Sequence, residues 1–202
     1  MTSTKDLLYY IPAGQYGKEG VLALLEQHPE IKFVSLVGID LAGNDTDEKI
    51  PMAAFFDDYE AFFEGRAVQT DGSSVVLTNI ATLNNARVDM WGDPSVNWFV
   101  DYNYENIDEA TGLPTGTLRI PAFLMHNYRY VDSRSILKNS CDYVRAELLS
   151  LIKEHGLPGM PHVKADDVVD IIFTSATELE FWVKTPSRTV TKKELSVSQR
   201  LQ

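Results

Sequence analysis

The most constraining feature of this sequence is a group of aromatic side chains spaced as on one face of a helix. Within residues 53–63, the aromatic positions fall at i, i+1, i+4, i+7 and i+8, and they are Phe55, Phe56, Tyr59, Phe62 and Phe63. This periodicity predicts an amphipathic helix, with Gly65 at the position of a C-terminal cap. Because so apolar a face must be covered, we expect the helix to pack on a sheet.

Strand-like segments lie on both sides of this helix. Residues 31–39 are rich in apolar and β-branched side chains, which predicts a strand. Gly43-Asn44-Asp45 predicts a turn into a second strand near residues 49–52, and thus a hairpin. A short helix is predicted over residues 18–28, which end before Pro29. The further strand-like segments are residues 75–80, 87–91, 95–102 and 117–125.

These elements predict an α+β fold in which residues 31–128 form a β-grasp-like domain. Residues 1–30 are then an N-terminal extension that carries the short helix. A boundary between two structural units is expected between about Met125 and Asp132.

A second helix is predicted after this boundary, with Asp132 or Ser133 as its N-cap. Its apolar stripe consists of Leu137, Cys141, Val144, Leu148, Leu151 and Ile152. In that stripe Cys141 is expected to be a core residue rather than a nucleophile. A long strand pattern follows over residues 168–183.

Charge and cysteine content disfavour several classes of function. The chain has 18 Lys and Arg against 29 Asp and Glu, so a nucleic acid partner is not expected, because phosphate backbones are bound by clustered cations. A single cysteine cannot form an internal disulfide, which favours a cytoplasmic location. The apolar stretch at residues 7–11 is too short for a signal sequence, and no run reaches the ~18 apolar residues of a membrane span, so no membrane partner is expected.

The segment Glu178-Leu179-Glu180 is a candidate metal site. On a strand, Glu178 and Glu180 would lie on the same face with Cα atoms about 7 Å apart. Two such carboxylates repel each other unless a cation lies between them, and Mg²⁺ or Mn²⁺ is the natural cation for oxygen ligands. The alternative is that this face is simply solvated.

Two further motifs are ambiguous when taken singly. Asp71-Gly72-Ser73-Ser74 is typical of an Asx-turn, and Asp89-Met90 is followed by Asp93-Pro94, a residue pair that is typical of a turn. In this order, followed by Glu178-Leu179-Glu180-Phe181, the motifs resemble the front part of glutamine synthetases. The family's usual Gly-Pro-Glu-Pro-Glu segment reads Ser175-Ala176-Thr177-Glu178-Leu179-Glu180 here, so the chain resembles a divergent branch.

The resemblance implies an enzyme that ligates ammonia to glutamate with ATP, through a γ-glutamyl phosphate. It implies that Asp71, Ser74 and Asp89 form the ammonium-binding loop, that Asp71 and Asp89 are catalytic, and that Glu178 and Glu180 are metal ligands for Mg²⁺ or Mn²⁺. Residues 129–202 are then the incomplete start of a catalytic domain, and the fragment alone is expected to be inactive. The partners implied are glutamate, ammonium, ATP and further copies of the chain, in a homo-oligomer whose neighbouring subunits share active sites.

Three alternatives remain at this point. The first is a γ-glutamyl ligase for an amine other than ammonia. The second is a non-catalytic β-grasp module for interaction or regulation. The third is an unrelated acidic α+β domain.

Overall fold

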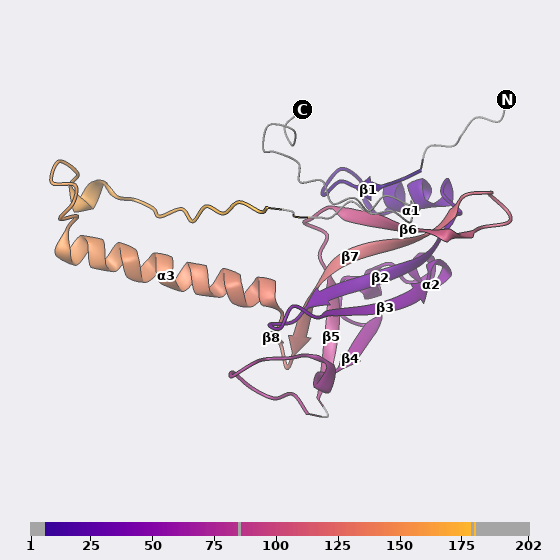
Figure 1. Cartoon of the computed structure of the whole chain (residues 1–202), viewed down its shortest axis with the longest axis horizontal. Coiled ribbons are helices and arrows are strands. Elements are labelled where there is room, and N and C mark those ends of the chain that lie inside the picture. Colours follow the sequence, from indigo (N-terminus) through magenta and orange to yellow (C-terminus); the bar gives the residue numbers. More distant parts are fainter. Residues whose placement is uncertain (1–6, 85, 179, 181–202) are drawn as a thin grey trace, which may run out of the picture.

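The computed structural model describes residues 7–84, 86–178 and 180. It shows a mixed sheet with two short helices at one end of the molecule, and a long helix that projects away from the sheet (Figure 1). The strands are β1 Tyr10–Ile11, β2 Ile31–Ile39, β3 Asp45–Pro51, β4 Val68–Asp71, β5 Arg87–Gly92, β6 Trp98–Ile107, β7 Pro114–His126 and β8 Arg129–Tyr130. The helices are α1 Lys18–Glu26, α2 Met52–Asp57 and α3 Ser133–His155, with the 3₁₀ turns η1 Glu60–Phe62, η2 Gly72–Ser74 and η3 Ala165–Asp167.

The long strand β7 organises the sheet. Along its first part β7 pairs with β2 in parallel and with β6 antiparallel, and along its last part it pairs with β5 and β8. The predicted strand over residues 31–39 is confirmed, and so is its hairpin, because β2 and β3 are antiparallel neighbours. The coarse expectation of a mixed α and β fold is therefore correct.

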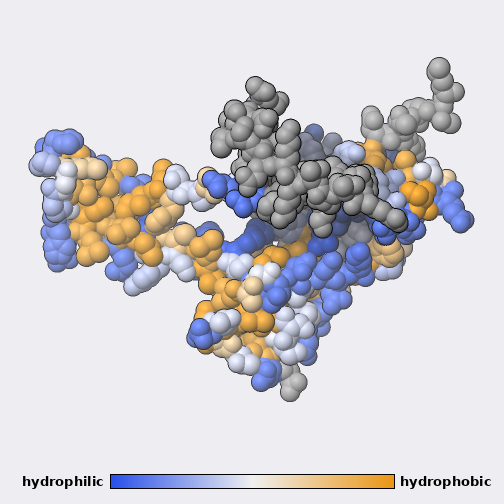
Figure 2. All heavy atoms as spheres, viewed as in Figure 1, coloured by the Kyte–Doolittle hydropathy of each residue, from blue (hydrophilic) through white to orange (hydrophobic). Residues whose placement is uncertain are grey.

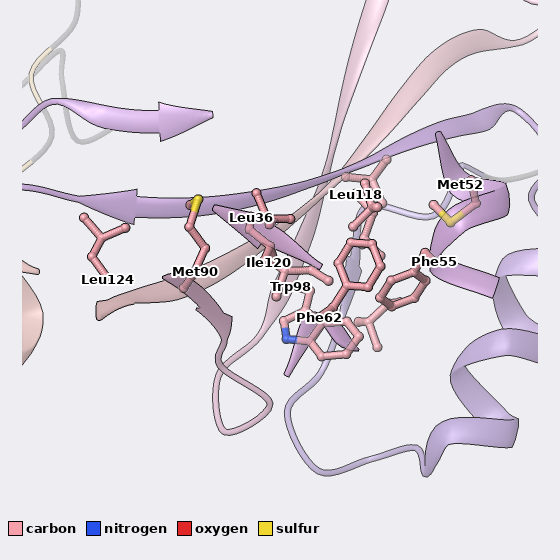
Figure 3. Close-up of a cluster of buried hydrophobic side chains, with 14 of the residues drawn as sticks. Leu36, Met52, Phe55, Phe62, Met90, Trp98, Leu118, Ile120 and Leu124 are labelled. Carbon is pink, nitrogen blue, oxygen red and sulfur yellow. The ribbon is translucent and has the colours of Figure 1, made fainter. Parts of the chain in front are cut away.

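The hydrophobic core lies where β2, β5 and β7 meet the segment that contains α2 and η1 (Figure 3). Leu36 of β2 and Ile120 of β7 are neighbours in the ladder, and both are fully buried. Met90 of β5 and Leu124 of β7 form the corresponding pair at the other end. Burying such side chains contributes roughly 1.5–3 kcal/mol each relative to their exposure.

The aromatic face is buried as predicted, but it belongs to two short elements instead of one helix. Phe55 of α2 and Phe62 of η1 are buried and make a T-shaped contact at 5.0 Å between ring centroids. The α-helix ends before Asp58, whose φ of −139° is not helical and whose carboxylate accepts from the Ala61 N–H. Gly65 lies two residues after Phe63, the C-cap of η1, and it terminates this turn with a left-handed φ of +67°, while the Arg66 N–H donates to the Ala61 carbonyl oxygen at 3.0 Å. A Cβ at Gly65 would lie 2.0 Å from Trp91 Nε1.

The strand predicted over residues 75–80 is not formed. These residues belong to a loop after η2 in which Leu77 and Ala81 make an isolated bridge. Val75 and Leu77 are buried, whereas Val76 between them is exposed. The alternating pattern therefore arises from two loop side chains that pack into the core. The connection from Asp71 to Ala86, of which the structure describes residues 71–84 and 86, is called the Asp71 loop below.

The start of α3 is tied to the sheet by polar contacts. The predicted N-cap is confirmed, since Asp132 Oδ1 accepts from the Ser135 N–H at 2.8 Å. Asp132 Oδ2 accepts from the Leu124 N–H of β7 at 3.2 Å. At the second residue of the helix, Arg134 Nη2 donates to Asp93 Oδ2 at 2.5 Å.

Beyond this junction, the predicted core stripe of α3 is exposed. The exposed fractions are 65% for Leu137, 42% for Val144, 37% for Leu148 and 49% for Leu151. Figure 2 shows hydrophobic residues gathered on the projecting part of the molecule. Cys141 is only partly buried, so its assignment to a core is wrong. The physical reason is that the part of the chain described by the structure provides no cover for this stripe.

The strand predicted over residues 168–183 is absent from the part of this range that the structure describes, residues 168–178 and 180. Asp170 instead binds Arg145 of α3 through two contacts, at 2.5 and 2.6 Å. A strand needs a neighbour that satisfies its backbone groups, and none of the described strands pairs with this segment. Within the described ranges, no helix combines the length and the apolarity needed to span a membrane.

Candidate functional site

The hairpin of β4 and β5 brings Asp71 and Asp89 onto one face of the sheet. In its register Asp71 lies opposite Arg87, and Gln69 lies opposite Asp89. Opposite residues of an antiparallel pair point to the same face, as do residues two apart on a strand. Val88 and Met90 point the other way, into the core. Asp71 and Asp89 are therefore diagonal neighbours, a relation that corresponds to about 7–8 Å.

Arg87 lies opposite Asp71 in the ladder, and its side chain contacts Asp89. Its Nε is 3.0 Å from Asp89 Oδ1, and its Nη2 is 3.5 Å from Asp89 Oδ2. The closer contact is an ion pair without hydrogen-bond alignment, and Asp89 Oδ1 has no hydrogen-bond partner among the described residues. The Arg87 side chain is largely exposed, so it can leave Asp89 without disturbing the core.

Asp71 ends β4 and caps the 3₁₀ turn η2. Its Oδ1 accepts from the Ser73 N–H at 2.7 Å. Hydrogen bonding from Ser73 lowers the pKa of Asp71 below its ordinary value, and the side chain of Ser73 has a larger effect than its backbone. Asp71 and Ser74 are both exposed, so a small polar ligand can reach them. Gly72 is required at its position because a Cβ would lie 2.1 Å from the Leu83 carbonyl oxygen.

A pocket of about 300 Å³ lies beside Asp89. It is lined by Arg87, Asp89, Trp91, Met125, His126, Asn127 and Tyr128. His126 Nδ1 lies 2.9 Å from the Arg87 carbonyl oxygen, which holds the imidazole at the rim. Asn127 and Tyr128 form the two-residue turn between β7 and β8, and both have positive φ, 48° and 61°. That conformation is unfavourable for tyrosine, and strained residues often occur at functional sites.

Glu178 and Glu180 do not join this group. Both are exposed and lie outside any described strand, so the expected shared strand face is not found; Leu179 and residues 181–183 lie outside the described residues. No cluster of three or more His, Cys, Asp or Glu side chains suited to a metal ion occurs in the described ranges. A Mg²⁺ or Mn²⁺ ion takes about six oxygen ligands, so the described residues do not fit a complete metal site.

Sequence reasoning missed Arg87, His126 and Asp40 as neighbours of the candidate site. Arg87 had a usable signal, because it precedes Asp89 by two residues on a strand and must share its face. His126 and Asp40 had none, because only the pairing of distant segments brings them to β5 and to the Asp71 loop.

Comparison with known proteins shows partial structural similarity at low identity. One similar structure is a chain of GmaS in an ADP complex, conformation 1, with a TM-score of 0.37 and 16% identity over 61% of this chain and 25% of that chain. Another is the cryo-EM structure of Plasmodium falciparum glutamine synthetase, with a TM-score of 0.44 and 15% identity over 68% of this chain and 24% of that chain. This chain spans about a quarter of each. No protein-family model and no curated protein matches the sequence.

Proposed function

We propose that this chain is the N-terminal portion of an ATP-dependent ligase of the glutamine synthetase type, which joins ammonia to glutamate. The observation that carries the proposal is the position of Asp71 and Asp89 on one face of the β4–β5 hairpin. The motif resemblance supplies the reaction, because it assigns ammonium binding to Asp71, Ser74 and Asp89. Asp71 and Asp89 are the proposed catalytic residues.

The proposed reaction has two steps. A γ-carboxylate oxygen of glutamate attacks the γ-phosphorus of ATP, the bond to the β-phosphate oxygen breaks, and ADP leaves. Ammonia then attacks the acyl carbon of γ-glutamyl phosphate, inorganic phosphate leaves, and glutamine is formed. Ammonium must lose a proton before this attack, so its site has to combine negative charge with a proton acceptor. Carboxylates such as Asp71 and Asp89 supply both.

Arg87 determines how a cation would enter this site. Its guanidinium already contacts Asp89, so ammonium has to displace it or bind on the free side of the carboxylate. We therefore expect weak ammonium binding in the millimolar range, and tighter binding when Arg87 is replaced by an uncharged residue of similar length.

The remaining parts of the proposed enzyme lie outside the described site. Glu178 and Glu180 supply two metal ligands at most, and the nucleotide and glutamate sites belong to further polypeptide. The exposed apolar stripe of α3 supports the proposal of further polypeptide, because the apolar face of an amphipathic helix normally packs against other protein. A homo-oligomer with shared active sites is part of the same proposal.

A second candidate is a γ-glutamyl ligase for an amine larger than ammonia. It is supported by the pocket beside Asp89, whose volume of about 300 Å³ far exceeds the roughly 30 Å³ of a molecule the size of water. Trp91 and Tyr128 line this pocket, and aromatic rings attract substituted ammonium ions.

The test is an NMR titration of the ¹⁵N-labelled chain with ammonium chloride, beside a sodium chloride series at equal ionic strength. We expect saturable shifts in residues 71–74 and 87–91 with ammonium alone. Asp89→Asn should abolish them, Arg87→Gln should strengthen binding, and Glu105→Gln, which changes an exposed carboxylate on β6, should leave it unchanged. Identical shifts with sodium contradict the proposal, and tighter binding of methylammonium than of ammonium favours the second candidate.

A further inference from the structure

Asp40 is a buried carboxylate that the proposed reaction does not use. It follows β2 directly, and only 1% of its surface is exposed. Its Oδ1 accepts from the N–H groups of Ala42 and Asn44, each at 2.9 Å. Its Oδ2 accepts from Asn44 Nδ2 at 3.0 Å and from the Val76 N–H at 2.9 Å. Both oxygens are thus fully engaged, and by donors from two segments of the chain.

The bond from Val76 joins the turn between β2 and β3 to the Asp71 loop. The Leu41 N–H donates to the Val76 carbonyl oxygen at 3.2 Å, so both backbone groups of Val76 are held by residues 40 and 41. Val75 and Leu77 are buried on either side. Val76 is therefore a fixed point of the loop.

This fixed point lies next to the turn that Asp71 caps. The turn η2 ends at Ser74, and the Val75 N–H donates to the Gly72 carbonyl oxygen at 3.1 Å. At the other side, the Gly72 N–H donates to the Ala86 carbonyl oxygen at 2.6 Å. The hairpin ladder and the Gly72 bond hold the start of η2, whereas Asp40 holds the chain two residues after its end.

We propose that Asp40 is a positioning residue for the amine site: it anchors the Asp71 loop just after η2, so that the turn stays closed and Ser73 stays within hydrogen-bond distance of the Asp71 carboxylate. The role in an amine site rests on the proposed function, whereas the link between Asp40 and the Asp71 loop does not. Burial by itself raises the pKa of Asp40, but hydrogen bonds from Val76, Asn44 and Ala42 outweigh it and leave the pKa lowered. The carboxylate is therefore ionised at neutral pH, as four donors pointing at two oxygens require. An asparagine has one acceptor oxygen, and its amide N–H would face another N–H.

The experiment compares Asp40→Asn with the wild-type chain by amide hydrogen exchange and by ¹³C NMR titration of the Asp71 carboxyl group. We expect exchange at Val75, Val76 and Ser73 to accelerate roughly tenfold or more relative to the core strands, because the anchor contributes a charged hydrogen bond. We also expect the pKa of Asp71 to rise toward its ordinary value as the cap at Ser73 loosens. Arg87, the charged group opposite Asp71, is unchanged in every variant.

Asp93→Asn is the matched control, because Asp93 is also a buried carboxylate that accepts several hydrogen bonds, but at the α3 junction. It should destabilise the chain without a selective effect on the Asp71 loop. If Asp40→Asn does not fold, Val76→Pro removes the donor from the other side and keeps the bonds between Asp40 and its own turn. Unchanged loop exchange and an unchanged Asp71 pKa in the folded variant overturn the proposal. Because neither readout needs a ligand, a failed ammonium titration leaves this result standing.

Discussion

At the scale of single residues, Ser73 is the hydrogen-bond donor to Asp71. Its hydrogen bonds lower the pKa of Asp71 and so keep the carboxylate negative in mildly acidic solution. We expect Ser73→Ala to raise this pKa toward the ordinary value of ~3.9, because the hydroxyl donor is lost while the backbone N–H remains. A ¹³C NMR titration of the Asp71 carboxyl group measures the shift.

Ser74→Ala is the control for this prediction. Ser74 is the next hydroxyl along the same exposed turn, and the lowered pKa of Asp71 has its causes in Ser73. The Asp71 pKa should therefore be the same in Ser74→Ala and in the wild-type chain. Equal shifts in the two variants would show that the turn, and not the Ser73 hydroxyl, determines the pKa.

The sequence predicts the role of a residue well when its partners are close in the sequence, and poorly when they are far apart. Asp71 and Asp89 were found through the order of short motifs, and strand pairing puts them on one face. Asp40 has its decisive partner, Val76, 36 positions away, and no local pattern marks that pair. The opposite holds for Glu178 and Glu180. Their local pattern is typical of a strand, but no described strand pairs with this segment, so the expected shared strand face is not found.

At the scale of elements, the junction of the sheet with α3 should be sensitive to acid. Burial raises the pKa of Asp93, but hydrogen bonds from Ser95 and Arg134 outweigh it and leave the pKa lowered. A carboxylate with a lowered folded-state pKa stabilises the fold above its unfolded-state pKa of ~3.9, and this contribution is lost as the pH falls through the folded value.

The measurement is denaturant unfolding of the wild-type chain and Asp93→Asn between pH 2 and pH 6. At pH 6 the substitution should lower the free energy of unfolding by roughly 1–3 kcal/mol, because it disrupts a buried, hydrogen-bonded charge. The two proteins should converge toward pH 2, where Asp93 is protonated in the wild-type chain too. A difference that stays constant with pH would contradict an ionic role for Asp93.

The exposed stripe of α3 leads to a prediction about stability. Leu151→Gln should change the free energy of unfolding by less than about 0.5 kcal/mol, because the side chain is half exposed. Leu118→Ala, in the fully buried part of β7, should cost roughly 2–5 kcal/mol. Chemical denaturation of both variants gives the comparison. A large loss of stability in Leu151→Gln would show that the stripe is covered in solution.

The sequence predicts a helix or strand correctly where the hydrophobic periodicity agrees with the strand pairing in the structure. The strand over residues 31–39 pairs on both sides over residues 33–37, so its pattern and its structure coincide. The aromatic face at residues 53–63 was buried as expected, but Asp58 breaks the helix in a way that the period alone does not reveal. In residues 75–80 the burial pattern of a strand is produced by two side chains that anchor a loop.

At the scale of the whole molecule, the chain alone should be catalytically inactive. The proposed ligation needs nucleotide, metal, glutamate and ammonium held in one site, and the described residues contain only the proposed ammonium site and two exposed acids. An ATP-dependent γ-glutamyl hydroxamate assay should give no turnover. Titration with Mn²⁺ should show millimolar or weaker binding, because two carboxylates supply only part of the about six oxygens required.

The control for this prediction is Glu178→Gln with Glu180→Gln. The double variant should abolish the weak Mn²⁺ binding and leave the thermal midpoint unchanged, since both side chains are exposed. Turnover by the unmodified chain would refute the proposal that it is a portion of a larger ligase.

The position of β7 in the sheet has a consequence for the order in which this protein can fold during synthesis. The strand β2 begins at Ile31, but its parallel neighbour β7, the central strand of the sheet, begins only at Pro114. On the ribosome, the first hundred or so residues therefore emerge with an open hydrophobic edge and no means of closing the sheet, and contacts this distant in sequence form slowly. A nascent chain whose translation is stalled before residue 114 should bind chaperones that recognise exposed apolar segments. The chaperones should dissociate from the chain once β7 has left the exit tunnel.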